Sequence, residues 1–138
     1  MEQLYLLDTN IASYALKGNS TAVDQHLLRV APSQLAMSTV TEGELRFGAA
    51  RLPHATRLNT LIEDFLLRVS ILPWDSAAAQ HYGHLRAALE RDGLPMGNLD
   101  TMIAAHALAS GATLVTNDRA FARIKKLKVE DWTKRPRH

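Results

Sequence analysis

The stretch LYLLDTNI, residues 4–11, sets the expectation for the fold. Its apolar first half is typical of a buried strand. Asp8 closes that run, and Thr9 and Asn10 offer a hydroxyl and an amide that could cap a following helix. We expect the helix to cover residues 11–17, so the stretch predicts a strand that leads directly into a helix.

The rest of the chain repeats this alternation. Apolar runs of strand length alternate with segments whose apolar residues recur at helical spacing, and Gly, Pro or small polar residues separate them. Such an order predicts a three-layer α/β/α sandwich around a central parallel sheet. The expected strands are 3–7, 35–37, 69–72, 112–115 and a short one at Val129, and the expected helices are 21–30, 38–50, one from Pro53, one from Asp75 to about Arg91, 99–110 with Asn98 as its cap, and one from Asp118.

Four acidic residues share one position in this alternation, the end of an apolar run and the start of a helix-like segment. They are Asp8, Glu44, Asp100 and Asp118. Because the carboxyl ends of parallel strands meet along one edge, we expect these acids in one cleft, where oxygen ligands would suit Mg²⁺. Carboxylates around such ions support phosphodiester hydrolysis. Small polar residues flank the acids and could orient water or contact phosphate: Thr9, Asn10, Ser38, Thr116 and Asn117.

Each acid also has a structural explanation. Glu44 follows Thr41, and Glu42 follows Thr39, at the spacing of a capping box. The other three acids lie where the N-terminal end of a helix favours negative charge. The residues alone therefore leave open a protein that binds nucleic acid or a partner without catalysis.

Composition narrows the class of protein. A chain of 138 residues with 46% hydrophobic and 22% charged residues is typical of one folded domain. The absence of cysteine excludes disulfides, thiolate zinc sites and cysteine nucleophiles. No apolar run is long enough to span a membrane and no signal-peptide pattern is present, so we expect a cytoplasmic protein.

The net charge of +2 hides an uneven distribution. Residues 119–138 contain eight Lys or Arg and two acids, which leaves residues 1–118 with a net charge of −4. A basic segment beside an acidic cleft would suit a polyanion held by its phosphates. A solvated terminus is the alternative that charge alone leaves open. We expect Trp132, within this segment, to pack at the core or its rim.

Other chemistries find little support. His81 and His84 share helical spacing, but no carboxylate accompanies them as a third ligand, so we expect surface or packing residues. His106 follows Asp100 by six residues, which turns it to the opposite side of a helix and predicts a core or interface histidine. Neither a nucleophile elbow nor a phosphate-binding glycine loop is present, which argues against serine hydrolases, NTPases and dinucleotide enzymes.

Four motifs carry a resemblance to a known family, and their order and spacing are more specific than any one of them. The chain resembles the PIN-domain ribonucleases over nearly its whole length, and specifically the VapC toxins of type II toxin–antitoxin pairs. The motifs are LLDTNI at 6–11, STVTEGELRFG at 38–48, GLPMGNLDTMIAAHA at 93–107 and LVTNDRAFARI at 114–124.

The resemblance implies a single PIN-like domain over residues 1–138, with a basic tail from about residue 125. It implies Mg²⁺, or Mn²⁺ in its place, as the cofactor. Asp8, Glu44 and Asp100 correspond to the family's first three metal-binding and catalytic acids. The expected substrate contacts are Thr9, Asn10, Thr116 and Asn117.

Two of these assignments required a choice. Glu44 matches the family better than Glu42 because it directly precedes Leu-Arg-Phe-Gly, which corresponds to the family's helix. Some relatives place the fourth acid where this chain has Ala120. Asp118 is the acid available in this turn, and we assign it the fourth metal-binding and catalytic role.

The resemblance also implies partners. The family's toxins cleave RNA, including transfer RNA, by water attack on a phosphodiester. They form homodimers and bind a VapB-type antitoxin, through which the complex binds promoter DNA. The apolar helical stripe at 58–65 is most simply part of the core, although the family's helices in this region form the groove that the antitoxin fills. The alternatives are a PIN nuclease of RNA processing, a metal-dependent DNA nuclease or phosphatase, and a non-catalytic protein that binds nucleic acid or a partner.

Overall fold

The computed structural model describes residues 2–137 and contains one sheet of parallel strands. The strand order is β3-β2-β1-β4-β5, so the first strand lies at the centre between β2 and β4. This order brings segments that are distant in sequence to the same edge of the sheet. The strands are β1 (Tyr5–Leu7), β2 (Leu35–Ser38), β3 (Ser70–Leu72), β4 (Thr113–Val115) and β5 (Val129–Glu130).

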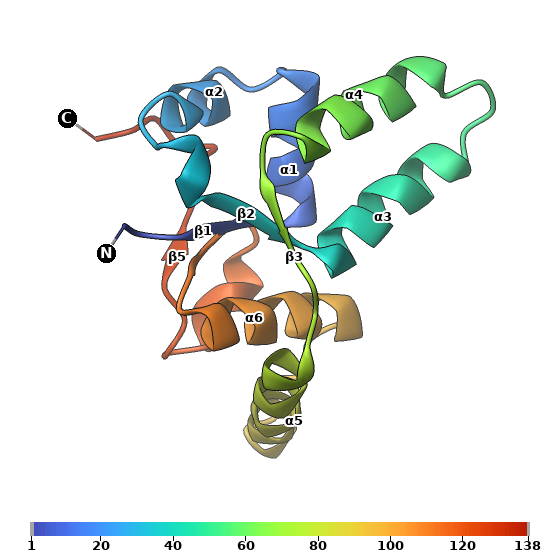
Figure 1. Cartoon of the computed structure of the whole chain (residues 1–138). Coiled ribbons are helices and arrows are strands. Elements are labelled where there is room, and N and C mark those ends of the chain that lie inside the picture. The colour runs from blue at the N-terminus through green and yellow to red at the C-terminus, as the bar shows by residue number, and fades with distance from the viewer. Residues whose placement is uncertain (1, 138) are drawn as a thin grey trace.

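Helices cover both faces of the sheet. In Figure 1 the helices α1 to α4 lie on one face and α5 and α6 on the other. This arrangement confirms the predicted three-layer α/β/α sandwich with a parallel sheet. Within residues 2–137, every helix is too short or too polar to cross a membrane. The helices are α1 (Thr9–Lys17), α2 (Thr21–Leu27), α3 (Thr39–Ala50), α4 (Thr56–Leu66), α5 (Ser76–Arg91) and α6 (Asn98–Ser110), with short 3-10 turns at Pro32–Gln34 and Arg119–Arg123.

Alternation along the strands divides the core into two parts. In β1, Leu6 packs with the α5–α6 layer, whereas Leu7 packs with the layer of α1 to α4. Leu114 and Val115 divide in the same way in β4. Successive strand side chains point to opposite faces, and both faces are covered, so these strands read as continuous apolar runs.

Several helix starts differ from the prediction. Asp8, and not Thr9 or Asn10, caps α1 with its side chain, and α6 begins at Asn98 after Gly97. Neither predicted capping box forms at α3, because Ser38 accepts the backbone N–H of Val40 at 3.1 Å. The segment after Asp118 is a 3-10 turn of five residues and not an α-helix. Local hydrogen-bond competition decided these starts, and the sequence offered several equivalent acceptors at each.

The basic segment from about residue 125 is folded onto the domain and does not project as a tail. Strand β5 pairs with β4, and Trp132 directly after it is 1% exposed. The Trp132 ring lies against Tyr5 and stacks on His26 of α2, with 5.2 Å between ring centroids in each pair. Trp132 therefore packs in the core, as predicted, and holds the C-terminal segment in place.

This burial makes Trp132 a sensitive test of the fold. Trp132→Ala should lower the free energy of unfolding by about 3–5 kcal/mol, because it leaves a cavity and removes both ring contacts. Urea unfolding followed by circular dichroism measures the change. The control is Val129→Ala in β5, where the side chain is 37% exposed, and this change should lower the free energy of unfolding far less. Equal losses in the two variants would show that Trp132 is not part of the core.

Candidate active site

The four predicted acids lie at the carboxyl edge of the sheet or on helices that begin there. Asp8 follows β1 and Asp118 follows β4, its neighbour in the sheet. Glu44 is on α3, which begins directly after β2, and Asp100 is in the first turn of α6. The parallel topology thus gathers residues that span more than 100 positions of sequence.

Asp8 is the most buried of the four, with 7% of its surface exposed. Its Oδ1 accepts the backbone N–H of Ile11 at 2.9 Å, so the carboxylate also caps α1. Burial raises the pKa of Asp8 to about 6, and the charges of Asp100 and Asp118 add to the increase. The neighbouring Thr116 hydroxyl and the Ile11 N–H oppose the shift because they favour the charged form.

Asp100 and Glu44 belong to the same electrostatic neighbourhood. Burial raises the pKa of Asp100, and the negative charges of Asp118 and Glu44 raise it further. Glu44 Oε1 accepts a hydrogen bond of 2.6 Å from the Thr9 hydroxyl. Glu42, the alternative acid on α3, instead forms a salt bridge with Arg46 at 2.8 Å. The geometry therefore places Glu44, and not Glu42, beside the other acids.

Asp118 is the most exposed member of the group. Its Oδ1 accepts the backbone N–H of Ala120 at 2.9 Å and so caps the 3-10 turn, while its own N–H donates to Thr116 Oγ1 at 3.1 Å. These bonds fix the turn, yet the carboxylate stays close enough to raise the pKa values of Asp8 and Asp100.

The four predicted substrate contacts divide by exposure. Thr116 is 1% exposed, and Thr9 is half-buried with its hydroxyl on Glu44, so both are positioned to orient acids. Asn10 is exposed, and its amide nitrogen lies 3.5 Å from Asn117 Oδ1, at the limit of a hydrogen bond. Asn10 and Asn117 are therefore the pair that a substrate could reach.

The donor set fits a hard divalent cation, since it consists of carboxylate oxygens without sulfur or imidazole. The salt bridges of residues 2–137 involve Glu42, Glu63 and Glu90, so they leave the four acids without a cationic partner. Within residues 2–137, no three His, Asp or Glu side chains are arranged so that they could hold a metal ion without moving. The acids are thus neighbours, while the assignment of each as a ligand stays a prediction.

One polar pair behind the acids was not predicted. His106 of α6 is buried, and its Nδ1 lies 2.8 Å from the Ser38 hydroxyl at the start of α3. The pair joins the helix that carries Asp100 to the helix that carries Glu44. Burial lowers the pKa of His106, which the charge of Asp75 opposes. A buried histidine was expected here, but no sequence signal links two residues 68 positions apart.

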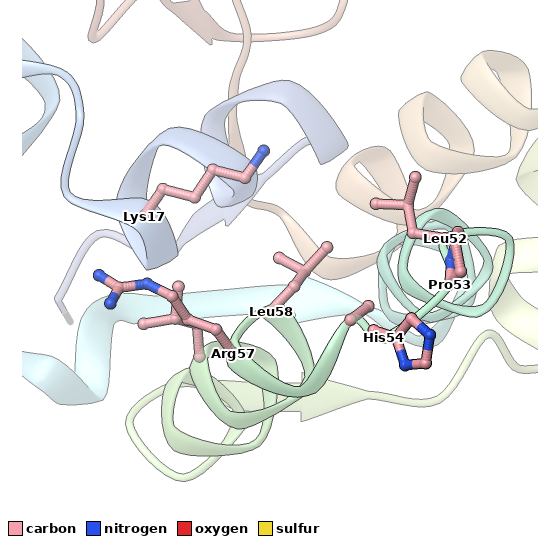
Figure 2. Close-up of a pocket in the computed structure, with 8 residues that line it drawn as sticks. Lys17, Leu52, Pro53, His54, Arg57 and Leu58 are labelled. Carbon is pink, nitrogen blue, oxygen red and sulfur yellow. The ribbon is translucent and has the colours of Figure 1, made fainter.

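A cavity of about 490 Å³ lies away from the acids. In Figure 2, Lys17 comes from α1 and Arg57 and Leu58 from α4, so the cavity lies between these two helices. Apolar side chains and three basic ones share its wall. The lining residues are Lys17, Leu52, Pro53, His54, Ala55, Arg57, Leu58 and Leu61.

Comparison with known proteins decides the family. The model of the PIN domain matches residues 5–127, which include all four acids. The chain belongs to the PIN domain family. Within it, the chain is 38% identical over 130 residues to the tRNA(fMet)-specific endonuclease VapC of Shigella flexneri, a match that covers 94% of this chain and 98% of the relative. The predicted resemblance is thereby confirmed.

Solved PIN-domain structures agree with the fold. DNA-bound VapBC from Salmonella typhimurium aligns with a TM-score of 0.88 at 35% identity, over 95% of this chain and 99% of that chain. VapBC2 from Rickettsia felis, bound to a DNA fragment from its promoter, aligns with a TM-score of 0.86 at 35% identity, over 93% and 98% of the two chains. Both structures are VapBC complexes, and the aligned chain in each matches this chain over nearly its full length.

The burial of Asp8 predicts an unusual effect on the stability of this PIN domain. Its pKa rises from 3.8 to about 6 on folding, so the folded protein holds the proton more tightly than the unfolded chain. Ionisation therefore costs stability as the pH rises from about 4 to about 6, and a shift of this size corresponds to about 3 kcal/mol.

Asp8→Asn removes the charge and keeps a capping side chain. In EDTA near neutral pH, the variant should be more stable than the wild type by about 1–3 kcal/mol, and the difference should vanish near pH 4. Thermal or urea unfolding across this pH range measures it. A variant that is less stable than the wild type at neutral pH would show that Asp8 carries no electrostatic penalty in the fold.

Proposed function

We propose that this protein is the toxin of a type II toxin–antitoxin pair and acts as a Mg²⁺-dependent endoribonuclease. The observation that carries the proposal is the group of four neighbouring carboxylates that form no salt bridge within residues 2–137, in a chain that matches VapC ribonucleases over nearly its full length. Asp8, Glu44, Asp100 and Asp118 would hold Mg²⁺ or Mn²⁺. The RNA substrate would place its action in the cytoplasm.

Within this site each residue has a separate task. A bound divalent cation would supply an activated water and neutralise the charge of the phosphate. The Ile11 N–H fixes the Asp8 carboxylate, and the Thr9 hydroxyl fixes that of Glu44. Asn10 and Asn117 lie where their amides could contact a phosphate oxygen. We assign water as the nucleophile because the chain belongs to the PIN domain family and its site offers carboxylates that could hold a water-activating cation.

The partners follow from the same family. We propose that a VapB-type antitoxin binds the protein, that two copies form a homodimer, and that the complex binds promoter DNA through the antitoxin. DNA-bound VapBC complexes support the antitoxin partner and the binding of promoter DNA. The cavity between α1 and α4 in Figure 2 is our candidate for part of the antitoxin groove, because it combines an apolar wall with Lys17, His54 and Arg57.

Cleavage of RNA by purified, antitoxin-free protein tests the proposal. Total bacterial RNA and purified initiator tRNA would each be incubated with Mg²⁺, with EDTA, and with the Asp100→Asn variant. The initiator tRNA is included because the relative from Shigella flexneri is named for it. Discrete fragments that disappear with EDTA and in the variant support the proposal. Intact RNA in every lane, from folded protein supplied with Mg²⁺, would argue for a binding protein or a different phosphate ester.

Two glutamates on α3 provide a matched comparison. Glu44→Gln should reduce the cleavage rate by more than about 100-fold, since a lost ligand costs more than the 10–100-fold typical of supporting residues. Glu42→Gln removes the same charge two residues away and breaks only an exposed salt bridge, worth at most about 1 kcal/mol. It should cleave like the wild type. The assignment of Glu44 fails if both variants retain activity or if both lose it.

Asp118 is tested by the metal requirement. Asp118→Asn keeps a side chain that can accept the Ala120 N–H, so the turn should survive. The Mg²⁺ concentration for half-maximal cleavage should rise by about 10-fold or more if Asp118 is a ligand. Asp92→Asn, in the exposed loop before α6, serves as the control. An unchanged Mg²⁺ titration in Asp118→Asn would remove this residue from the site.

A further inference from the structure

Strand β5 divides the basic C-terminal residues into two groups of three. Lys125, Lys126 and Lys128 precede β5, whereas Lys134, Arg135 and Arg137 follow it. Because β5 runs parallel to β4, the chain leaves β5 at the same edge of the sheet where Asp118 follows β4. The second group therefore starts at the edge that carries the acids and extends from there toward Arg29, which lies between α2 and β2, whereas the first group belongs to the opposite edge.

Residues 131–137, here called the C-terminal strap, are held in place by His26 of α2 and by Arg29 just after this helix. The Lys134 carbonyl accepts a 2.7 Å hydrogen bond from His26 Nε2, and the Arg137 carbonyl accepts a 2.7 Å hydrogen bond from Arg29. The His26 ring also stacks parallel on buried Trp132, with an interplanar angle of 1°. In Figure 1 the C-terminal segment accordingly runs beside α2.

These contacts use the main chain of the strap and leave its cationic side chains exposed. Lys134, Arg135 and Arg137 are all exposed, and the salt bridges within residues 2–137 involve other cations, Arg46 and Arg86. A fixed backbone with free cations is an arrangement that binds an anion at little further cost in chain entropy.

A cavity of about 340 Å³ joins the strap to Asp118, one of the four acids. One side of it is formed by Asn117, Asp118 and Arg119, and the other by Asp131, Thr133 and Lys134 of the strap. A phosphate beside the acids meets negative charge from four carboxylates, so cations on an adjoining wall would be needed to hold an RNA backbone there. The cavity places Lys134 at that position.

We propose that the strap is a substrate-positioning surface, on which Lys134 beside Asp118, and Arg135 and Arg137 farther along the strap, bind successive phosphates of the single-stranded RNA that leads to the cleaved one. Lys125, Lys126 and Lys128 do not take part, although they belong to the same basic stretch of sequence. The inference rests on the proposed function for its substrate, and it adds which cations contact the RNA and how α2 holds them.

Two triple variants test the division. One changes Lys134, Arg135 and Arg137 to Gln, and the other changes Lys125, Lys126 and Lys128 to Gln, so each removes three positive charges from the same end of the chain. Both are made in the Asp100→Asn background to prevent cleavage. Binding of a labelled, single-stranded oligouridine is followed by fluorescence anisotropy between about 50 and about 200 mM salt.

The strap variant should bind about 10-fold more weakly or worse at the low salt concentration. Its slope of log affinity against log salt should be smaller by about two, because each phosphate contact on a single strand contributes about 0.7. The other variant should bind like its parent.

A version with Lys134→Arg, Arg135→Lys and Arg137→Lys keeps the charges and should restore binding, which separates charge from folding. In the active background, the strap variant should raise KM with kcat nearly unchanged.

Equal weakening in both triple variants, or none in either, would overturn the proposal, because long-range charge would then explain any effect. Unchanged RNA binding together with loss of the antitoxin complex would assign the strap to the antitoxin and overturn it as well. If the wild type binds oligouridine through the strap but cleaves no RNA, the strap stands and the nuclease assignment falls. The two proposals can therefore fail separately.

Discussion

Negative charge that no cation within residues 2–137 pairs with, held at the carboxyl edge of a parallel sheet, is the constraint on which the rest of the structure depends. Asp8 is almost fully buried, and its pKa is raised to about 6 by burial and by the charges of Asp100 and Asp118. A fold that only needed helix caps would have no reason to place carboxylates against one another, because each raises the cost of ionising the next. A divalent cation removes that cost, and this is the physical basis for treating the edge as a metal site.

The surrounding elements make this arrangement tolerable. The N-terminal turn of α1 donates the Ile11 N–H to Asp8, and the Thr9 hydroxyl satisfies Glu44. Behind them, the buried pair of His106 and Ser38 connects α6 to the start of α3, so the helices that carry Asp100 and Glu44 are coupled. On the other side, His26 of α2 and Arg29 just after it hold the C-terminal strap, whose Lys134 shares a cavity with Asp118. Backbone donors, hydroxyls and helix contacts thus hold the four acids in position, and salt bridges within residues 2–137 leave their carboxylates available to a ligand.

The sequence was informative where a pattern is local and ambiguous where contacts are distant. Within residues 2–137, all five strands overlap the predicted apolar runs, and β2 and β5 each extend one residue beyond them. The central strands are mostly apolar because both faces of the sheet are covered there. The choice of Glu44 over Glu42 came from a motif, and the structure supplies its physical reason in the Thr9 bond and the Arg46 salt bridge. The contact between His106 and Ser38 and the folding of the basic segment onto α2 depend on neighbours in space, which composition and spacing do not encode. The cap of α1 is local, but Asp8, Thr9 and Asn10 all offered an acceptor there.

The most direct test of the central claim is a titration of the protein with Mn²⁺, followed by the electron paramagnetic resonance signal of the free ion. We predict saturable binding to the wild type near neutral pH, strongly weakened in Asp8→Asn and Glu44→Gln and unchanged in Glu42→Gln. Binding that is absent from the wild type, or that is the same in all four proteins, would contradict the assignment of the edge carboxylates as a metal site.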